Sequence, residues 1–315
     1  MKTVQIIVPV YNEEEGLRRF HEVVGGIADS LVDHAVSFIF VNDGSSDGSM
    51  SVIRSLAKED PRVKYISFSR NFGKEAAIYA GLRNSSADMV ILIDADLQHP
   101  PELIPEMLSY VGSGEYDACG AKRYPGFMSR LFTSINNRMS TVKLQTGATD
   151  YMRMSRKFVN AVMSLCENQR FSKGLFAWVG YRVKWIDYVQ GPRTTGKSKW
   201  NFRKLLSYAI DGITGFSLIP LRMVSLAGVV ICTLAVIYII ITLIKTLVNG
   251  IDVPGYATLL VILLFMGGII LLSIGILGSY IGRIFMESKD RPVYLTDETN
   301  IEKDPEQGSD SGHTI

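Results

Sequence analysis

The sequence predicts an α/β domain that is followed by a hairpin of two membrane-spanning helices. In residues 1–121, short apolar runs alternate with segments of helical periodicity, which is typical of a mostly parallel sheet covered by helices. Nearer the C-terminus, Met223–Ile244 and Val253–Gly282 contain no charged residue. Each of these runs reaches the roughly 20 apolar residues that a helix needs to cross a bilayer.

Five apolar runs in the first part of the chain are predicted as strands. Val4–Val10 is continuously apolar rather than alternating, which fits a strand that is buried on both faces. The other predicted strands are Ser37–Val41, Val63–Phe68, Met89–Ile93 and Asp117–Ala121. The predicted helices between them are residues 12–31, Met50–Ala57, Lys74–Arg83 and Pro101–Val111.

The two long apolar runs are predicted to pair as a helical hairpin, with spans at about residues 223–245 and 256–282. Their short connection contains Asn249-Gly250 and Pro254-Gly255, which are turn-forming pairs. A buried pair of core helices is the alternative, but two runs this long rarely fit a soluble core. Basic residues flank the outer ends of both spans, whereas the connection holds only Lys245. Both ends of the hairpin are therefore expected to face the cytosol.

The predicted spans divide the chain into four parts. Residues 1–200 form a cytosolic α/β domain, and residues 201–221 form interfacial amphipathic helices. Residues 222–283 hold the two spans, and residues 284–315 form a cytosolic, partly disordered tail. The part from Thr296 onward is acidic, polar and poor in aromatic residues, which predicts disorder there.

Composition and motifs limit the partners, the cellular compartment and the nucleotide-binding classes that we expect for the protein. The formal net charge is only +2, so overall charge does not indicate a nucleic-acid partner, and none is expected. The three cysteines are widely spaced and show no metal-ligand spacing, which indicates reduced thiols in a cytosol-facing chain. Neither GxGxxG nor GxxxxGK[ST] follows a predicted strand, which excludes the usual dinucleotide-binding and P-loop classes.

Polar motifs follow three of the predicted strands: Tyr11-Asn12-Glu13, Asn42-Asp43-Gly44 and Asp94-Ala95-Asp96. Because ligands of such sheets bind beyond the carboxyl ends of the strands, one edge is expected to gather all three motifs. Asp94 and Asp96 share a face of an extended chain and repel each other unless a cation lies between them. Mg²⁺ or Mn²⁺ is therefore predicted at these two carboxylates, with Gln98 as a further oxygen ligand. An Asp-rich turn is the alternative.

Single residues near the same edge admit two interpretations. Asp43 can accept a hydrogen bond from a ribose hydroxyl or a base N–H, or it can belong to an Asx-turn. Lys74 opens a predicted helix and can meet a phosphate there, or it can be a solvated lysine. His99, which precedes two prolines, is predicted as a loop residue rather than a metal ligand.

The segments VPVYNEE, VNDGSSDGS, RNFGKEAAIYAGL and DADLQHPPE resemble, in order and spacing, the inverting GT-A glycosyltransferases of family 2. The closer resemblance is to the polyprenyl-phosphate glycosyltransferases, which include dolichyl-phosphate mannose synthases and bacterial bactoprenol glucosyltransferases. It covers about residues 3–294 and is carried by AKRYPG, TDYMRMSRK, KGLFAWVGY, GKSKWNFRKLLSYAIDGITGFSLIPLR and LGSYIGRIFMESKDRP. This family implies a Rossmann-like GT-A fold for the catalytic domain.

The resemblance also implies a role for each candidate residue. Asp94 and Asp96 would bind the diphosphate through the metal, with Gln98 as a further ligand, and Asp150 would lie near the sugar or the acceptor. The residues implied to bind the nucleotide-sugar also include Pro9, Tyr11, Glu13, Asp43 and Lys74, and a loop with Arg193, Lys197 and Lys199. Arg123 and Arg130 would meet the acceptor phosphate. The chain departs from the family at Thr149, where relatives often have glycine.

The implied reaction moves a hexose with inversion from a nucleotide-sugar to undecaprenyl phosphate in the bacterial cell membrane. UDP-glucose is the expected donor, and UDP-N-acetylglucosamine, UDP-galactose and GDP-mannose are the alternatives. The lipid-linked sugar would then need a flippase and a second glycosyltransferase to modify cell-envelope glycans. A homo-oligomer is also implied, as tetramers occur in the family.

Two other functions fit the sequence less well. A processive polysaccharide synthase would carry a Gln-x-x-Arg-Trp motif, which residues 168–171 lack, and two spans cannot enclose a glycan pore. A non-catalytic membrane module that binds nucleotide would not need acidic residues at three strand ends.

Overall fold

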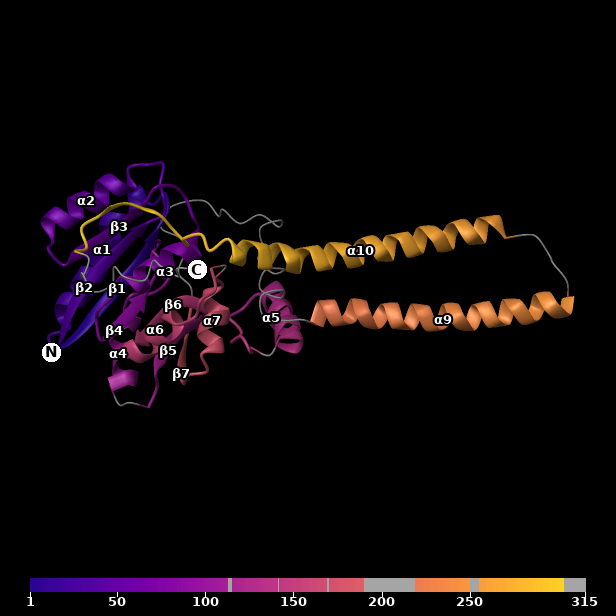
Figure 1. Ribbon diagram of the computed structural model, residues 1–315. Coiled ribbons are helices and arrows are strands. Elements are labelled where there is room, and N and C mark those ends of the chain that lie inside the picture. The colour runs from indigo at the N-terminus through magenta and orange to yellow at the C-terminus, as the bar shows by residue number, and fades with distance from the viewer. Residues whose placement is uncertain (113–114, 141, 169, 190–218, 250–254, 303–315) are drawn as a thin grey trace.

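The computed structural model describes residues 1–112, 115–140, 142–168, 170–189, 219–249 and 255–302. The α/β domain and the two long helices of the predicted hairpin are both within this part of the chain (Figure 1). Arg193, Lys197 and Lys199 lie outside the described residues, as do the interfacial helices predicted for residues 201–221 up to residue 218.

The domain is built on one eight-stranded sheet with the strand order β7-β5-β6-β4-β1-β2-β3-β8. The strands are β1 (Lys2–Val10), β2 (His34–Asn42), β3 (Val63–Phe68), β4 (Met89–Leu92), β5 (Ala118–Arg123), β6 (Ala148–Ser155), β7 (Val183–Tyr188) and β8 (Thr296–Thr299). The five strands predicted from apolar runs all form. The sheet is mostly parallel, but β6 runs antiparallel to β4 and β5, and β8 runs antiparallel to β3.

Helices cover both faces of the sheet. They are α1 (Glu14–Ser30), α2 (Ser49–Glu59), α3 (Lys74–Arg83), α4 (Leu103–Gly112), α5 (Phe127–Met139), α6 (Arg156–Met163) and α7 (Ser172–Trp178). Along β1, Ile6 and Val8 belong to the core cluster that contains α1, α2 and α4, whereas Ile7 belongs to the cluster that contains α3 and α6. Successive side chains of a strand point to opposite faces, so both faces of β1 need apolar residues. This explains why its sequence does not alternate.

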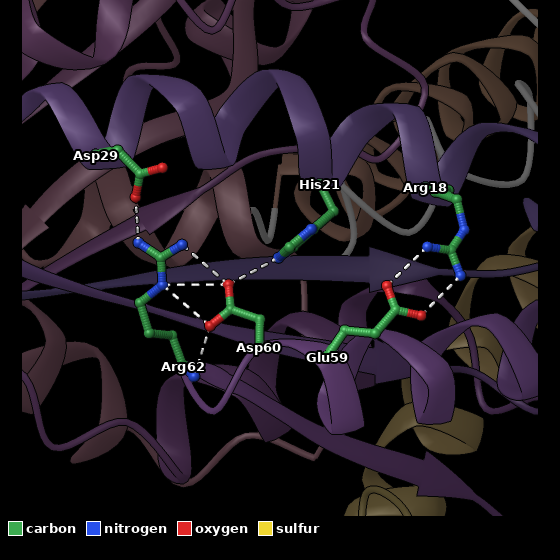
Figure 2. A network of polar contacts seen from close by, with 6 residues as sticks. All are labelled: Arg18, His21, Asp29, Glu59, Asp60 and Arg62. Carbon is green, nitrogen blue, oxygen red and sulfur yellow. Dashed lines mark hydrogen bonds and ion pairs between the residues drawn. The ribbon is translucent and has the colours of Figure 1, made fainter.

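A polar network joins α1 to the end of α2 on the outside of the domain (Figure 2). Arg62 lies between Asp29 and Asp60, and a nitrogen of its guanidinium is 3.0 Å from Asp60 Oδ2. His21 also reaches Asp60, and Arg18 pairs with Glu59 at 2.8 Å. Several of these side chains are exposed, and exposed ion pairs contribute little each. We therefore assign this network to the packing of α1 on α2 rather than to a ligand site.

The two long helices, α9 (Ile219–Asn249) and α10 (Tyr256–Ser288), lie side by side and antiparallel, and they extend away from the domain (Figure 1). Both contain the predicted spans and are longer than those spans. Within the described residues, one segment, Phe265–Ser288, is long and apolar enough to cross a membrane, with a mean hydropathy of 1.9. The corresponding apolar segment of α9, Met223–Tyr238, is shorter. Of the two predicted spans, the one in α10 thus contains a candidate by this measure within the described residues, and the one in α9 stays a prediction.

The carboxyl ends of the parallel strands face the hairpin. The N-terminus, where β1 begins, lies at the opposite end of the domain from α9 and α10 (Figure 1). Next to the carboxyl edge, Phe72 and Glu75 share a cavity of about 300 Å³ with Arg283 of α10. The backbone N–H of Asn168 donates to the Glu287 carboxylate of α10 at 3.0 Å. The C-terminal end of α10 therefore lies next to the same edge of the sheet that carries the polar motifs.

The chain returns from α10 to the far edge of the sheet as a C-terminal strap, residues 293–301. Tyr294 stacks on Phe68 with the ring centroids 4.8 Å apart, and Glu298 pairs with Arg54 at 2.5 Å. The Asn300 side chain accepts from the Tyr65 N–H at 2.7 Å and donates to the Val63 carbonyl at 3.1 Å. The prediction of disorder from Thr296 onward is thus wrong for Thr296–Thr299, which form β8. The segment is polar, and composition alone therefore predicted disorder. Its ordering depends on contacts with β3, which is far away in the sequence.

We expect Asn300→Ala to lower the free energy of unfolding of the domain by about 1–3 kcal/mol, because it removes both hydrogen bonds between the Asn300 side chain and the backbone of β3. Urea denaturation followed by tryptophan fluorescence would measure this change. Thr296→Ala, on an exposed residue of β8, is the matched control and should have little effect. Equal stability of both variants and the unaltered protein would contradict the role given to the strap.

Candidate active site

The loops that follow β1 and β2 are joined by hydrogen bonds. The Asn12 side chain accepts from the Ser46 N–H at 2.8 Å, and the Asn12 N–H donates to the Ser45 hydroxyl at 3.0 Å. Asn12 has φ 54°, a left-handed conformation that asparagine tolerates better than most residues. The Glu14 carboxylate accepts from the Gly48 N–H at 2.8 Å. The first two polar motifs therefore lie together, as predicted.

The residues predicted to hold a nucleoside differ in their exposure. Tyr11 is 40% exposed at the edge of the sheet. Pro9 and Glu13 are half-buried, and the Glu13 N–H donates to the Ser49 hydroxyl at 3.0 Å. Of these three residues, Tyr11 presents the most surface to solvent at this edge.

Asp43 is only 3% exposed, and its carboxylate holds the loop that leads into α3. It accepts from the Phe72 N–H at 2.6 Å, the Gly73 N–H at 3.0 Å and the Asn71 side chain at 2.9 Å. Burial raises the pKa of Asp43, and the backbone hydrogen bonds from Phe72 and Gly73 oppose that rise. The carboxylate that was predicted to face a ribose is thus engaged within the protein.

An ammonium group joins two carboxylates at the centre of the edge. Lys74 Nζ lies 2.7 Å from Asp94 Oδ1 and 2.7 Å from Asp150 Oδ2, so the first residue of α3 connects the end of β4 to β6. Burial raises the pKa of Asp94, but Lys74 and His99 outweigh it and hold this pKa below its ordinary value. Burial likewise raises the pKa of Asp150, and Lys74 and Lys173 lower it overall. Both carboxylates are therefore charged at neutral pH.

Asp96 and Gln98 complete the acidic loop after β4. Both are half-buried, and Asp96 Oδ1 accepts from the Gln98 N–H at 3.1 Å. Among the residues that the structure describes, no three His, Cys, Asp or Glu side chains gather as a metal site. The predicted ligand set contains two carboxylates, Asp94 and Asp96. That donor set fits Mg²⁺ or Mn²⁺, which use one or two carboxylates and complete their coordination with substrate phosphates and water.

The two arginines predicted to meet the acceptor lie on one connection. Arg123 is the last residue of β5 and Arg130 belongs to the first part of α5, and both residues are exposed. The Arg123 N–H donates to the Gly147 carbonyl at 3.0 Å, in the turn before β6. Arg123 thus lies near the start of the strand that carries Asp150.

Three residues of the site were missed or misread from the sequence. His99 does lie in a loop, but it is only 7% exposed, and it contacts Asp94 and Tyr188. Lys173 Nζ lies 3.9 Å from Asp150 Oδ1. Glu75 accepts a hydrogen bond from the Ser172 N–H at 2.8 Å and so fixes the start of α7. Lys173 is the first residue of KGLFAWVGY, a segment that carries the family resemblance, so the sequence offered a reason to consider it. No feature of the sequence indicated the partners of His99.

Two family models match parts of the chain. Residues 5–173 match the family model of Glycosyl transferase family 2, and residues 219–284 match the GtrB C-terminal hairpin. The bactoprenol glucosyl transferase of Shigella phage SfV is 42% identical over 300 residues, which cover 93% of this chain and 97% of that protein. The prophage bactoprenol glucosyl transferase homolog of Escherichia coli K12 is 39% identical over 300 residues, 93% of this chain and 97% of that protein.

Among solved structures, glucosyl-3-phosphoglycerate synthase from Mycobacterium tuberculosis aligns with a TM-score of 0.48 and 18% identity, over 68% of this chain and 78% of that one. The first family match spans more than half of the chain, and the two transferases match nearly all of it. The chain therefore belongs to glycosyl transferase family 2, as a glycosyltransferase with a GT-A domain and a GtrB-type C-terminal hairpin.

Proposed function

We propose that this glycosyltransferase moves a hexose from a nucleoside diphosphate sugar to polyprenyl phosphate, with inversion at the anomeric carbon. The observation that carries the proposal is the acidic edge around Asp94 and Asp150, which faces the helix that contains the candidate span. Relatives that match 93% of the chain are named for bactoprenol, which supports undecaprenyl phosphate as the acceptor. Their names also favour glucose, so UDP-glucose is our first choice of donor. UDP-N-acetylglucosamine, UDP-galactose and GDP-mannose are the other candidates.

The donor would bind across the carboxyl edge of the sheet. Tyr11, with Pro9 and Glu13 beside it, would contact the nucleoside, while Asp43 would support the site by fixing the loop before α3. Asp94 and Asp96 would hold Mg²⁺ or Mn²⁺, with Gln98 near them. The bound cation would neutralise charge that develops on the diphosphate leaving group. Lys74 adds a fixed positive charge at the same place.

The acceptor requires recognition rather than deprotonation. A lipid phosphate is already ionised at neutral pH, so no strong general base is needed to activate it. Arg123 and Arg130 are our candidates for its recognition, because guanidinium groups match phosphate oxygens. Lys74 and Lys173 keep Asp150 charged and oriented. We assign Arg193, Lys197 and Lys199, which lie outside the described residues, to contacts with the diphosphate.

The placement of the site suggests a cellular setting. A lipid phosphate lies at the membrane surface, and α10 leaves the domain beside the acidic edge. We propose a multi-pass protein of the bacterial cell membrane with a cytosolic catalytic domain, acting as a homo-oligomer. A product made on that side would require a flippase and a second glycosyltransferase before its sugar reaches a cell-envelope glycan.

A panel of radiolabelled donors with undecaprenyl phosphate and Mg²⁺ or Mn²⁺ tests the reaction directly. We expect a single labelled glycolipid, formed fastest from UDP-glucose, when the purified full-length protein is used. Long labelled polymer made without lipid phosphate would instead indicate a processive synthase. Absence of any labelled lipid with all four donors would reject polyprenyl phosphate as the acceptor.

Replacing Asp96 by Asn should reduce glycolipid formation by about 100-fold or more, because the leaving group then loses charge stabilisation. The initial rate with UDP-glucose measures the effect at saturating Mn²⁺. Asp33→Asn changes an exposed aspartate beyond α1 and should leave the rate within about twofold. A normal rate in the Asp96 variant would remove this residue from the mechanism.

Lys74→Met should reduce the rate by roughly 100-fold, because it deletes the ammonium that contacts Asp94 and Asp150. Lys74→Arg, which keeps the charge with a different shape, should retain more activity than the methionine variant. The two kcat values, together with thermal midpoints to verify folding, make the comparison. Equal and small losses in both variants would argue that the charge of Lys74 is not used.

A further inference from the structure

His99 is a buried histidine with a defined partner for each ring nitrogen. It lies in the loop between β4 and α4 and is 7% exposed. Its Nδ1 is 2.7 Å from the Tyr188 hydroxyl, and its Nε2 is 3.4 Å from Asp94 Oδ2. The ring also packs against Tyr151, with the centroids 5.5 Å apart. With both nitrogens directed at protein groups, the ring has little surface left to contact a substrate.

The partners of the two ring nitrogens determine which nitrogen of His99 donates a hydrogen bond and which accepts one. Asp94 lies beside the Lys74 ammonium and is a carboxylate, so it can only accept a hydrogen bond. Nε2 therefore carries the hydrogen and points it at Asp94, and Nδ1 accepts from the Tyr188 hydroxyl. The result is a chain in which Tyr188 orients His99 and His99 orients Asp94.

The two partners of Asp94 differ in their exposure. Lys74, with 44% of its side chain exposed, contacts both carboxylate oxygens, Oδ1 at 2.7 Å and Oδ2 at 2.9 Å. His99, with a side chain that is 9% exposed, approaches Oδ2 at 3.4 Å. Tyr188 is the last residue of β7 and pairs with Arg123 of β5 in the sheet register. The buried contact therefore connects the orientation of Asp94 to a fixed part of the sheet.

We propose that His99, held by Tyr188, is a positioning residue that orients the Asp94 carboxylate to bind the divalent cation and the donor diphosphate. The proposal rests on the proposed function, in which Asp94 is a metal ligand. Partners that orient a metal ligand typically change metal affinity by about 10–100-fold when they are removed. His99 itself contacts neither metal nor substrate in this arrangement.

Two amide substitutions separate the two contacts of the ring. The amide nitrogen of a glutamine can take the place of Nε2 and donate to Asp94. The amide of an asparagine ends near the position of Nδ1, where its oxygen can accept only from the Tyr188 hydroxyl. Mn²⁺ binding to the full-length protein with UDP present, followed by the electron paramagnetic resonance signal of free Mn²⁺, needs no acceptor and no turnover. We expect His99→Asn to raise the dissociation constant for Mn²⁺ by about 10–100-fold, and His99→Gln by clearly less.

Tyr188→Phe removes one hydroxyl and keeps the ring. It therefore tests the series of contacts from Tyr188 through His99 to Asp94 with the smallest change in packing. We expect a rise in the Mn²⁺ dissociation constant that is smaller than that of His99→Asn, with a thermal midpoint close to that of the unaltered protein. Unchanged Mn²⁺ affinity in folded His99→Asn, or equal losses in the asparagine and glutamine variants, would overturn the proposal. A protein that binds Mn²⁺ as expected but makes no glycolipid would reject the proposed function and leave this inference standing.

Discussion

The candidate site depends on the neutralisation of two carboxylates by one ammonium. Asp94 follows the end of β4 and Asp150 belongs to β6, and the two carboxylates would repel each other if they were left alone at the sheet edge. Lys74 lies within 2.7 Å of both and comes from a third element, the first turn of α3. The loop before α3 is in turn fixed by Asp43, which is buried under it. The position of this one side chain thus depends on the correct packing of four separate segments.

The antiparallel course of β6 makes that arrangement possible. Because β6 lies between β4 and β5 and runs opposite to both, its N-terminal residues lie at the carboxyl edge of its neighbours. Asp150 is near the start of β6 and therefore reaches the same edge as Asp94, which follows the end of β4. A parallel strand in this position would place a residue near its start at the opposite side of the sheet.

Much of the fold follows from local pattern, and the remainder depends on contacts between distant segments. Val4–Val10 could be predicted as a buried strand because both of its faces need apolar residues, and the three polar motifs could be placed at one edge because parallel strands end together. The burial of His99 could not be predicted, because its partner Tyr188 is 89 residues away. Asp43 was predicted at the correct place, but its partners in the loop before α3 changed its role. Disorder was predicted for Thr296–Thr299 because composition does not show that this segment pairs with the distant strand β3.

The C-terminal strap also determines when the sheet can be completed during translation. β8 is the last strand of the sheet in the chain, and Glu298 contacts Tyr65 across 233 residues of sequence. Both long helices are made between these two contacts, so the sheet cannot close on β8 until α9 and α10 have left the ribosome. Until then, β3 remains an unprotected edge with free backbone groups that can pair with another chain. The nascent domain is therefore most exposed to aggregation while its hairpin is being synthesised.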